Sequence, residues 1–255
     1  MVQVEIIQAV SIVLYAIASM TQSNKQVNTT MAWFACAFHL ISATLALGGT
    51  SQFALNAVQA INFSTAFVVL GFLVSSIRND ILIIGKALYP FSVTCILVAM
   101  VTPKPEGIEI TPGIMAHILI SVVAFSIMAL AAVEATLIQL IRARLKKHKV
   151  NAINKMIPPL QTLEAMLMQT IRCGLIVLSA AILTGAYFVE QFFSLQLIPK
   201  TTLTLMAWLL FSILLVGHSW FGWGGRVITR VTLAGYFLLL LGFIGVKWFF
   251  NEAHL

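Results

Sequence analysis

Charged residues are scarce in this chain, and their scarcity decides its class. Only 9% of the 255 residues are Asp, Glu, Lys or Arg, against roughly 25% in a soluble globular domain. Hydrophobic residues make up 60%, and the mean hydropathy is +0.99. No polar stretch is long enough for a separate soluble domain. The composition therefore excludes an ordinary soluble enzyme and predicts a single membrane domain over residues 1–255.

Motifs of soluble catalysis are also missing. The chain has no Walker loop, no dinucleotide-binding fingerprint, no HExxH pair and no serine-nucleophile elbow. Its three cysteines, Cys36, Cys95 and Cys173, are scattered through apolar stretches without a CxxC pair, which argues against a disulfide or a thiol-exchange site. Nucleotide chemistry and serine hydrolysis therefore have no support in the sequence.

Eight apolar segments are present, each close to the ~20 residues needed to cross a bilayer. They lie near 4–21, 30–48, 57–76, 81–101, 113–141, 166–188, 203–219 and 229–250. These segments predict an all-α, polytopic membrane bundle of eight transmembrane helices. We expect the fifth helix to extend to residue 147. The residues 160–166, which follow a Pro-Pro pair, are expected to lie along the inner interface before the sixth helix crosses.

The net charge of +7 comes from basic residues beside the apolar segments. With both termini on the non-cytoplasmic side, the cytoplasmic side receives twelve Lys and Arg residues and the other side only Lys104, Lys200 and Lys247. This asymmetry satisfies the positive-inside rule. The segment 142–165 is then a basic cytoplasmic loop, and we expect contact with anionic membrane lipid and none with nucleic acid.

Histidines in apolar segments are the main candidates for function, because ionisable groups are costly inside a membrane. His39 lies in the middle of the second segment, and His218 lies one turn from the cytoplasmic end of the seventh. His117 opens the fifth segment at the external surface, and His254 follows the eighth on the same side. His148, within the basic tract, is interpreted as solvated. Imidazole is a ligand of transition metals and of haem iron, but a membrane histidine can also simply hydrogen-bond a neighbouring helix.

The stretch 217–226, GHSWFGWGGR, is the most distinctive in the chain. Its glycines allow a tight turn between the seventh and eighth helices. Trp220 and Trp223 are either aromatic residues of the membrane interface or walls of a site for a flat cofactor. Arg226 and Arg230, one helical turn apart, mark the inner side of the membrane and are also placed to pair with haem propionates.

Three stretches resemble the cytochrome c assembly superfamily, and in particular its short HemX-like and YpjD-like inner-membrane members. They are AHILISVVAF at 116–125, PPLQTLE at 158–164, and the region 208–247, which ends in TLAGYFLLLLGFIGVK. The resemblance covers 113–250 well, and the first four helices match in general pattern only. It implies bis-histidine ligation of haem b inside the bundle, with His218 as one ligand and His39 as its partner. His117 and His254 are then candidate external ligands.

The larger members of that superfamily export haem and attach it to apocytochrome c, and they present it on a tryptophan-rich external segment. In this chain the residues 190–200, between the sixth and seventh helices, contain no tryptophan. The resemblance therefore implies haem handling, haem transport or a part in cytochrome c biogenesis, without the synthase activity. The implied partners are proteins of cytochrome c maturation or of haem biosynthesis.

Two alternatives remain open. The first is a non-enzymatic accessory or regulatory membrane protein of haem biosynthesis that acts through its basic loop. The second is a small-molecule or proton transporter without haem. Glu134, late in the fifth helix, either pairs with a basic residue or snorkels inward, or else it accepts protons in such a relay or orients a histidine. Hydropathy does not separate these possibilities.

Overall fold

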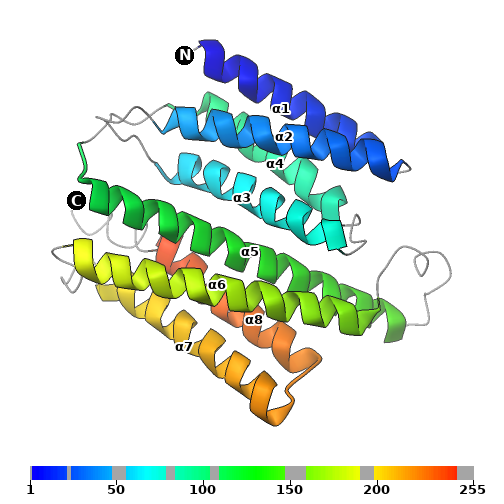
Figure 1. Cartoon of the computed structure of the whole chain (residues 1–255), viewed down its shortest axis with the longest axis vertical. Helices are drawn as coiled ribbons and strands as arrows, with labels where there is room; N and C mark the ends of the chain where they lie inside the picture. Colours follow the sequence, from blue (N-terminus) through cyan, green and yellow to red (C-terminus); the bar gives the residue numbers. More distant parts are fainter. Residues whose placement is uncertain are drawn as a thin grey trace. The chain divides into compact units, whose positions relative to one another are not determined.

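The computed structural model describes residues 2–21, 24–47, 56–78, 84–103, 109–146, 159–189 and 198–245. Within these ranges the regular structure is helical (Figure 1). The helices are α1 (Val2–Met20), α2 (Lys25–Ala46), α3 (Ala57–Arg78), α4 (Gly85–Val101), α5 (Pro112–Lys146), α6 (Leu160–Phe188), α7 (Ile198–Phe221) and α8 (Arg226–Leu240), which continues into the π-helical turn η2 (Leu241–Gly245). The prediction of an eight-helix membrane protein is confirmed.

The helices are long enough to cross a bilayer. In the described part of the chain, seven of them meet the requirements of length and apolarity, and α4 is a shorter apolar helix of 17 residues. At 1.5 Å per residue, the 35 residues of α5 and the 29 of α6 span about 52 and 44 Å. Both exceed the ~30 Å of the hydrocarbon layer, so the ends of α5 and α6 extend beyond it.

The first compact unit contains α1 to α4. Each helix packs on the next, and α1 also packs on α4, which closes a four-helix ring. Fully buried alanines, including Ala18, Ala32 and Ala35, allow the helices to approach closely. The interior of this unit is rich in uncharged polar side chains, which are Gln8, Ser11, Asn28, His39, Ser42, Gln59, Asn62, Ser64, Thr65 and Ser92.

The second compact unit contains α5 to η2. Here α5 packs on α6, α6 on α7, α7 on α8 and α8 on α5, so this unit is also a closed four-helix ring. Its core includes Leu167, Phe211 and Leu214, all fully buried. A Cβ atom on Gly235 would lie 2.7 Å from Cζ of Phe211. The glycine therefore permits the close packing of α8 on α7.

Two helix starts differ from the prediction. α2 begins at Lys25 because Oδ1 of Asn24 accepts the backbone N–H of Val27 at 3.3 Å and caps the helix. α6 is continuous from Leu160, and Leu163 and Met166 are buried inside the unit. The expected interfacial segment at 160–166 is therefore the first part of α6. The basic loop predicted at 142–165 is helical at both ends, and its residues 147–158 lie outside the described residues.

Candidate functional site

The turn between α7 and α8 folds back onto the last residues of α7. The backbone N–H of Trp223 donates to the carbonyl oxygen of Gly217 at 3.1 Å, and Nδ1 of His218 lies 2.7 Å from the carbonyl oxygen of Trp223. The indole of Trp223 covers Gly217 so closely that a Cβ atom there would collide with it. Gly222 and Gly225 have φ of 66° and 62°, values that favour glycine. The glycines of the 217–226 stretch therefore form the turn that holds His218.

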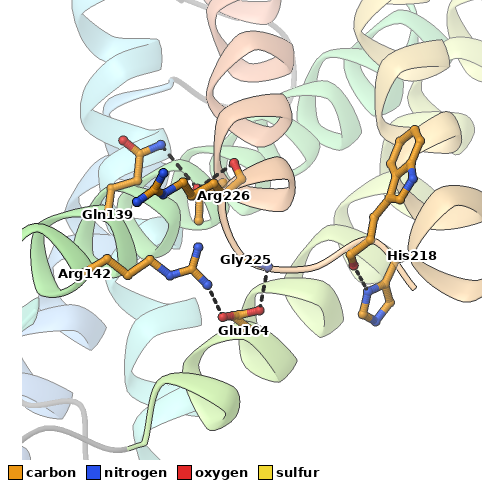
Figure 2. A network of polar contacts seen from close by, with 8 residues as sticks. Gln139, Arg142, Glu164, His218, Gly225 and Arg226 are labelled. Carbon is orange, nitrogen blue, oxygen red and sulfur yellow. Dashed lines mark hydrogen bonds and ion pairs between the residues drawn. The ribbon is translucent and has the colours of Figure 1, made fainter. Parts of the chain in front are cut away.

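The hydrogen bond to Trp223 determines which nitrogen of His218 can bind a ligand (Figure 2). A carbonyl oxygen only accepts hydrogen bonds, so in the neutral ring Nδ1 carries the proton and donates it. The lone pair then lies on Nε2, which has no hydrogen-bond partner among the described residues. The side chain is partly exposed. Metal-binding histidines adopt this arrangement, with one nitrogen bonded to a backbone carbonyl and the other available for the metal.

A carboxylate connects this turn to α5 and α6. Oε1 of Glu164, in the first turns of α6, forms an ion pair with the guanidinium of Arg142 near the end of α5. Oε2 of Glu164 accepts the backbone N–H of Gly225 at 2.9 Å (Figure 2). Gly225 is the residue that precedes α8. Glu164 therefore holds the start of α8 against the end of α5.

The other predicted residues of the turn lie at its surface. Trp220 is 82% exposed on the last turn of α7, and Arg226 and Arg230 are exposed on α8. Neither arginine forms an ion pair within the described ranges. Trp223 is only partly exposed, because its ring packs on the end of α7. The turn and its flanking helix ends therefore bring together five of the predicted binding residues.

His117 resembles His218 in its hydrogen bonding, at the opposite end of the second unit. It lies in the second turn of α5, and its Nδ1 is 3.1 Å from the carbonyl oxygen of Ala181 and 3.3 Å from Oγ1 of Thr184. The hydroxyl of Thr184 donates to carbonyl oxygens of its own helix, so its oxygen can accept. Nδ1 is again the donor, and the lone pair lies on Nε2. The predicted partner His254 lies outside the described residues, so their contact stays a prediction.

His39 is held in a different way, inside the first unit. It is fully buried. Its Nε2 lies 3.0 Å from Oδ1 of Asn62 and donates to it, so Nδ1 carries the lone pair and can accept from the hydroxyl of Tyr15, which lies 3.5 Å away. Both ring nitrogens therefore have partners on other helices. His39 and His218 belong to different compact units, so their shared ligation of one iron stays a prediction.

Removal of the Asn62 amide is expected to destabilise the first unit. In Asn62→Leu the Nε2–H of His39 loses its acceptor, which costs about 1–3 kcal/mol in an apolar interior, whereas replacing both partners by apolar groups is close to neutral. We therefore expect the double variant His39→Leu, Asn62→Leu to lose less stability than the sum of the losses in the two single variants, since the Tyr15 hydroxyl loses its acceptor in every protein that carries His39→Leu. Thermal unfolding of the detergent-solubilised variants measures this. Additive losses in the double variant would contradict the contact.

Glu134 is buried in α5 without a charged partner among the described residues. It is 4% exposed, and Oε1 accepts a hydrogen bond from the hydroxyl of Thr170 at 3.2 Å. Oε2 is buried and has no hydrogen-bond partner. The observed partner of Glu134 is therefore a threonine and not a basic residue.

Arg142 and Glu164 were not singled out from the sequence. A signal was present, since Glu164 is an isolated acidic residue on the side that also carries the basic tract. Its bond to Gly225, 61 residues away, has no sequence signature. Asn62 and Thr184 were also missed, because amides and hydroxyls are ordinary residues of membrane helices.

The described helices, which are long and apolar, define this molecule as a polytopic membrane protein, and hydrogen-bonded histidines lie near the start of α5 and the end of α7. The family of cytochrome c assembly proteins matches residues 27–254. Because this match covers most of the chain, the protein belongs to the cytochrome c assembly protein family. The resemblance found in the sequence is confirmed.

The chain is also similar to individual bacterial proteins. The inner membrane protein YpjD of Escherichia coli K12 is 29% identical over 172 residues, which are 67% of this chain and 65% of the relative. An uncharacterized 28.8 kDa protein in the nifR3-like 5′ region of Azospirillum brasilense is 29% identical over 154 residues, which are 59% of this chain and 57% of the relative. No solved structure matches the chain. The chain is a multi-pass protein of the inner membrane, as predicted.

Proposed function

We propose that this protein binds haem b in the inner membrane and handles it during cytochrome c biogenesis. Membership of the cytochrome c assembly family supports the context. The observation that carries the proposal is the hydrogen bond from Nδ1 of His218 to the carbonyl oxygen of Trp223, which leaves Nε2 available. An imidazole held in this way already has the tautomer in which Nε2 can bind a metal.

The number of potential ligands favours haem over a metal ion bound by protein alone. A structural zinc site needs four side chains and a catalytic site three. Within the described residues no three His, Cys, Asp or Glu side chains gather at one point. Haem iron already has four porphyrin nitrogens and needs only one or two axial ligands from the protein. Isolated imidazoles fit the second requirement.

The turn between α7 and α8 carries groups of the kinds that bind the iron, the porphyrin and the propionates of a haem. His218 would bind the haem iron, the exposed Trp220 would contact the porphyrin, and Arg226 and Arg230 would pair with the propionates. Bound haem supplies an iron that changes between the ferrous and ferric states. His39 stays the predicted second ligand of the iron. At the other end of the unit, His117 would be an external ligand, with His254 as its predicted companion.

A spectrum of the intact protein tests this proposal. We expect protein expressed with sufficient haem and purified in detergent to show a Soret band and, after reduction, sharp α and β bands, because two imidazoles give low-spin iron. His117→Ala is expected to retain most of this spectrum, since His117 lies at the far end of the unit. A colourless protein after haem-replete expression would refute haem binding and favour an accessory or a transport role.

A second candidate function, proton-coupled transport, is favoured by one observation. Glu134 is a buried carboxyl with an unpartnered Oε2 in a membrane-spanning helix, and such groups mark proton relays. On this alternative, Glu134→Gln is expected to abolish proton uptake by proteoliposomes, whereas Arg144→Ala is expected to leave it unchanged. If haem handling is the function, Glu134→Gln leaves the haem spectrum as it is. The two measurements on one variant separate the candidates.

A further inference from the structure

The carboxylate of Glu164 lies where three elements meet. One oxygen contacts Arg142 of α5, and the other accepts the N–H of Gly225 at the start of α8, while Glu164 itself belongs to α6 (Figure 2). The first N–H groups of a helix have no partner within the helix, and a negative charge there is favoured by the helix dipole. Both carboxylate oxygens are therefore used, each by a group on a different element.

The Arg142 guanidinium packs against the same point of the turn. A Cβ atom on Gly225 would lie 3.2 Å from Nη1 of Arg142, so the guanidinium lies against the glycine backbone. The side chains of the ion pair are only 18% and 21% exposed. An exposed ion pair contributes little to stability, but this one is partly buried and includes a backbone N–H. It therefore restrains the backbone of the turn as well as joining two side chains.

The restrained residue Gly225 is close in sequence to Trp223, the hydrogen-bond partner of His218. Gly225 is two residues after Trp223, and the Trp223 carbonyl oxygen is the acceptor that keeps the proton of His218 on Nδ1. A turn with two glycines at positive φ is easily rearranged unless other contacts hold it. The hydrogen bond from Trp223 N–H to Gly217 holds the turn on one side of the Trp223 carbonyl, and the bond from Gly225 to Glu164 holds it on the other, so loss of the Glu164 contact leaves that carbonyl restrained from one side only.

We propose that Glu164 and Arg142 are positioning residues that act through the Gly225 turn to hold the Trp223 carbonyl in place and so keep His218 in the tautomer that presents Nε2. The identity of the ligand rests on the proposed haem-binding function, but the tautomer itself does not. The two residues contact neither the imidazole nor the ligand. Their effect is on the orientation and protonation of the histidine that does.

The tautomer of His218 is the direct test. Full-length protein without haem, labelled with ¹⁵N-histidine, gives separate signals for protonated and unprotonated ring nitrogens, and His218→Ala identifies those of His218. We expect Nδ1–H alone in the native protein and in the control Arg144→Ala, which alters another basic residue near the end of α5. In Glu164→Ala and Arg142→Ala we expect a mixture of both tautomers. A ring that stays entirely Nδ1–H in Glu164→Ala overturns the proposal.

Two further variants separate positioning from simple stability. Glu164→Gln keeps an oxygen that can accept the Gly225 N–H, so we expect it to preserve the tautomer even if it melts earlier. The charge-reversed pair Arg142→Glu, Glu164→Arg restores an ion pair but places no acceptor on α6 for that N–H, so we expect it to regain stability without the native tautomer. Full recovery of the tautomer in the reversed pair would overturn the requirement for a hydrogen-bond acceptor on α6.

We call the contacts of Glu164 with Arg142 and Gly225 the clamp. A haem titration tests whether the clamp matters for the proposed function. Loss of the hydrogen-bond partner of a metal ligand typically weakens metal affinity by about 10- to 100-fold. Glu164 acts on that partner indirectly, so we expect a loss of up to this size in Glu164→Ala. If native protein binds no haem, the proposed function fails while the NMR result still tests the clamp. If native protein binds haem and Glu164→Ala binds it equally well with an unchanged tautomer, the clamp fails and the function stands.

Discussion

Replacement of His218 by alanine is expected to abolish the sharp α and β bands of the reduced protein. The reason is the loss of Nε2, the imidazole nitrogen that the turn between α7 and α8 leaves available. Removing a ligand itself should weaken haem binding by more than the about 10- to 100-fold typical of losing a neighbouring hydrogen-bond partner. The measurement is the reduced-minus-oxidised spectrum together with a haem titration of the purified variant.

Other histidines provide the controls for this experiment. His148 lies in the basic tract and outside the described residues, and His148→Ala is expected to retain the native spectrum. His39→Ala distinguishes two possibilities, because His39 is both a predicted ligand of the haem iron and a hydrogen-bonded residue of the first unit. A change from a low-spin to a high-spin spectrum in His39→Ala indicates that a ligand of the iron is lost. Lower thermal stability with native bands indicates that His39 has a structural role. Native bands in His218→Ala would contradict the assignment of the ligand.

The second large effect is expected from Gly217→Ala. A Cβ atom at this position would collide with the indole of Trp223, so the turn has to move away from the end of α7. Overpacking of this kind typically costs about 1–3 kcal/mol. The movement also separates the Trp223 carbonyl from His218, so haem affinity is expected to fall together with the melting temperature. Both are measured on the purified variant.

A compensating change makes this prediction specific. Trp223→Leu removes the indole but keeps the backbone carbonyl that accepts from His218, so the double variant Gly217→Ala, Trp223→Leu is expected to regain most of the haem affinity. Gly224→Ala is the matched control, because a Cβ atom there has nothing nearer than 3.8 Å. If Gly217→Ala binds haem like the native protein, the fold-back of the turn is not needed for ligand presentation.

Hydropathy predicted the helices because long apolar segments have to form helices in a bilayer, where each backbone polar group must be satisfied within its own segment. It did not predict where α2 begins, since that start depends on the side chain of Asn24 as a cap. It also placed 160–166 at the interface, because the spacing of Leu163 and Met166 looks the same whether these residues face lipid or a neighbouring helix. Local hydrogen bonds and packing partners decide such boundaries, and they are not visible in average hydropathy.

The candidate site was predictable in its residues but not in its chemistry. His218 stands out as an ionisable group near the end of an apolar helix, and the glycines after it indicate a turn. Which nitrogen would be available depends on the carbonyl of Trp223, and that contact requires the turn to fold back onto Gly217. The bond between Glu164 and Gly225 likewise joins residues far apart in sequence. Tertiary contacts of this kind carry no periodic signal.

The most direct test of the central claim is chemical rescue of the ligand. His218→Gly leaves a space beside the carbonyl of Trp223 that added imidazole can enter, so we predict that the variant loses the α and β bands and regains them when imidazole is supplied. Phe221→Gly, at the exposed end of the same helix, controls for the introduced glycine and is expected to need no imidazole. A His218→Gly protein that keeps native bands without imidazole would show that His218 does not bind the iron.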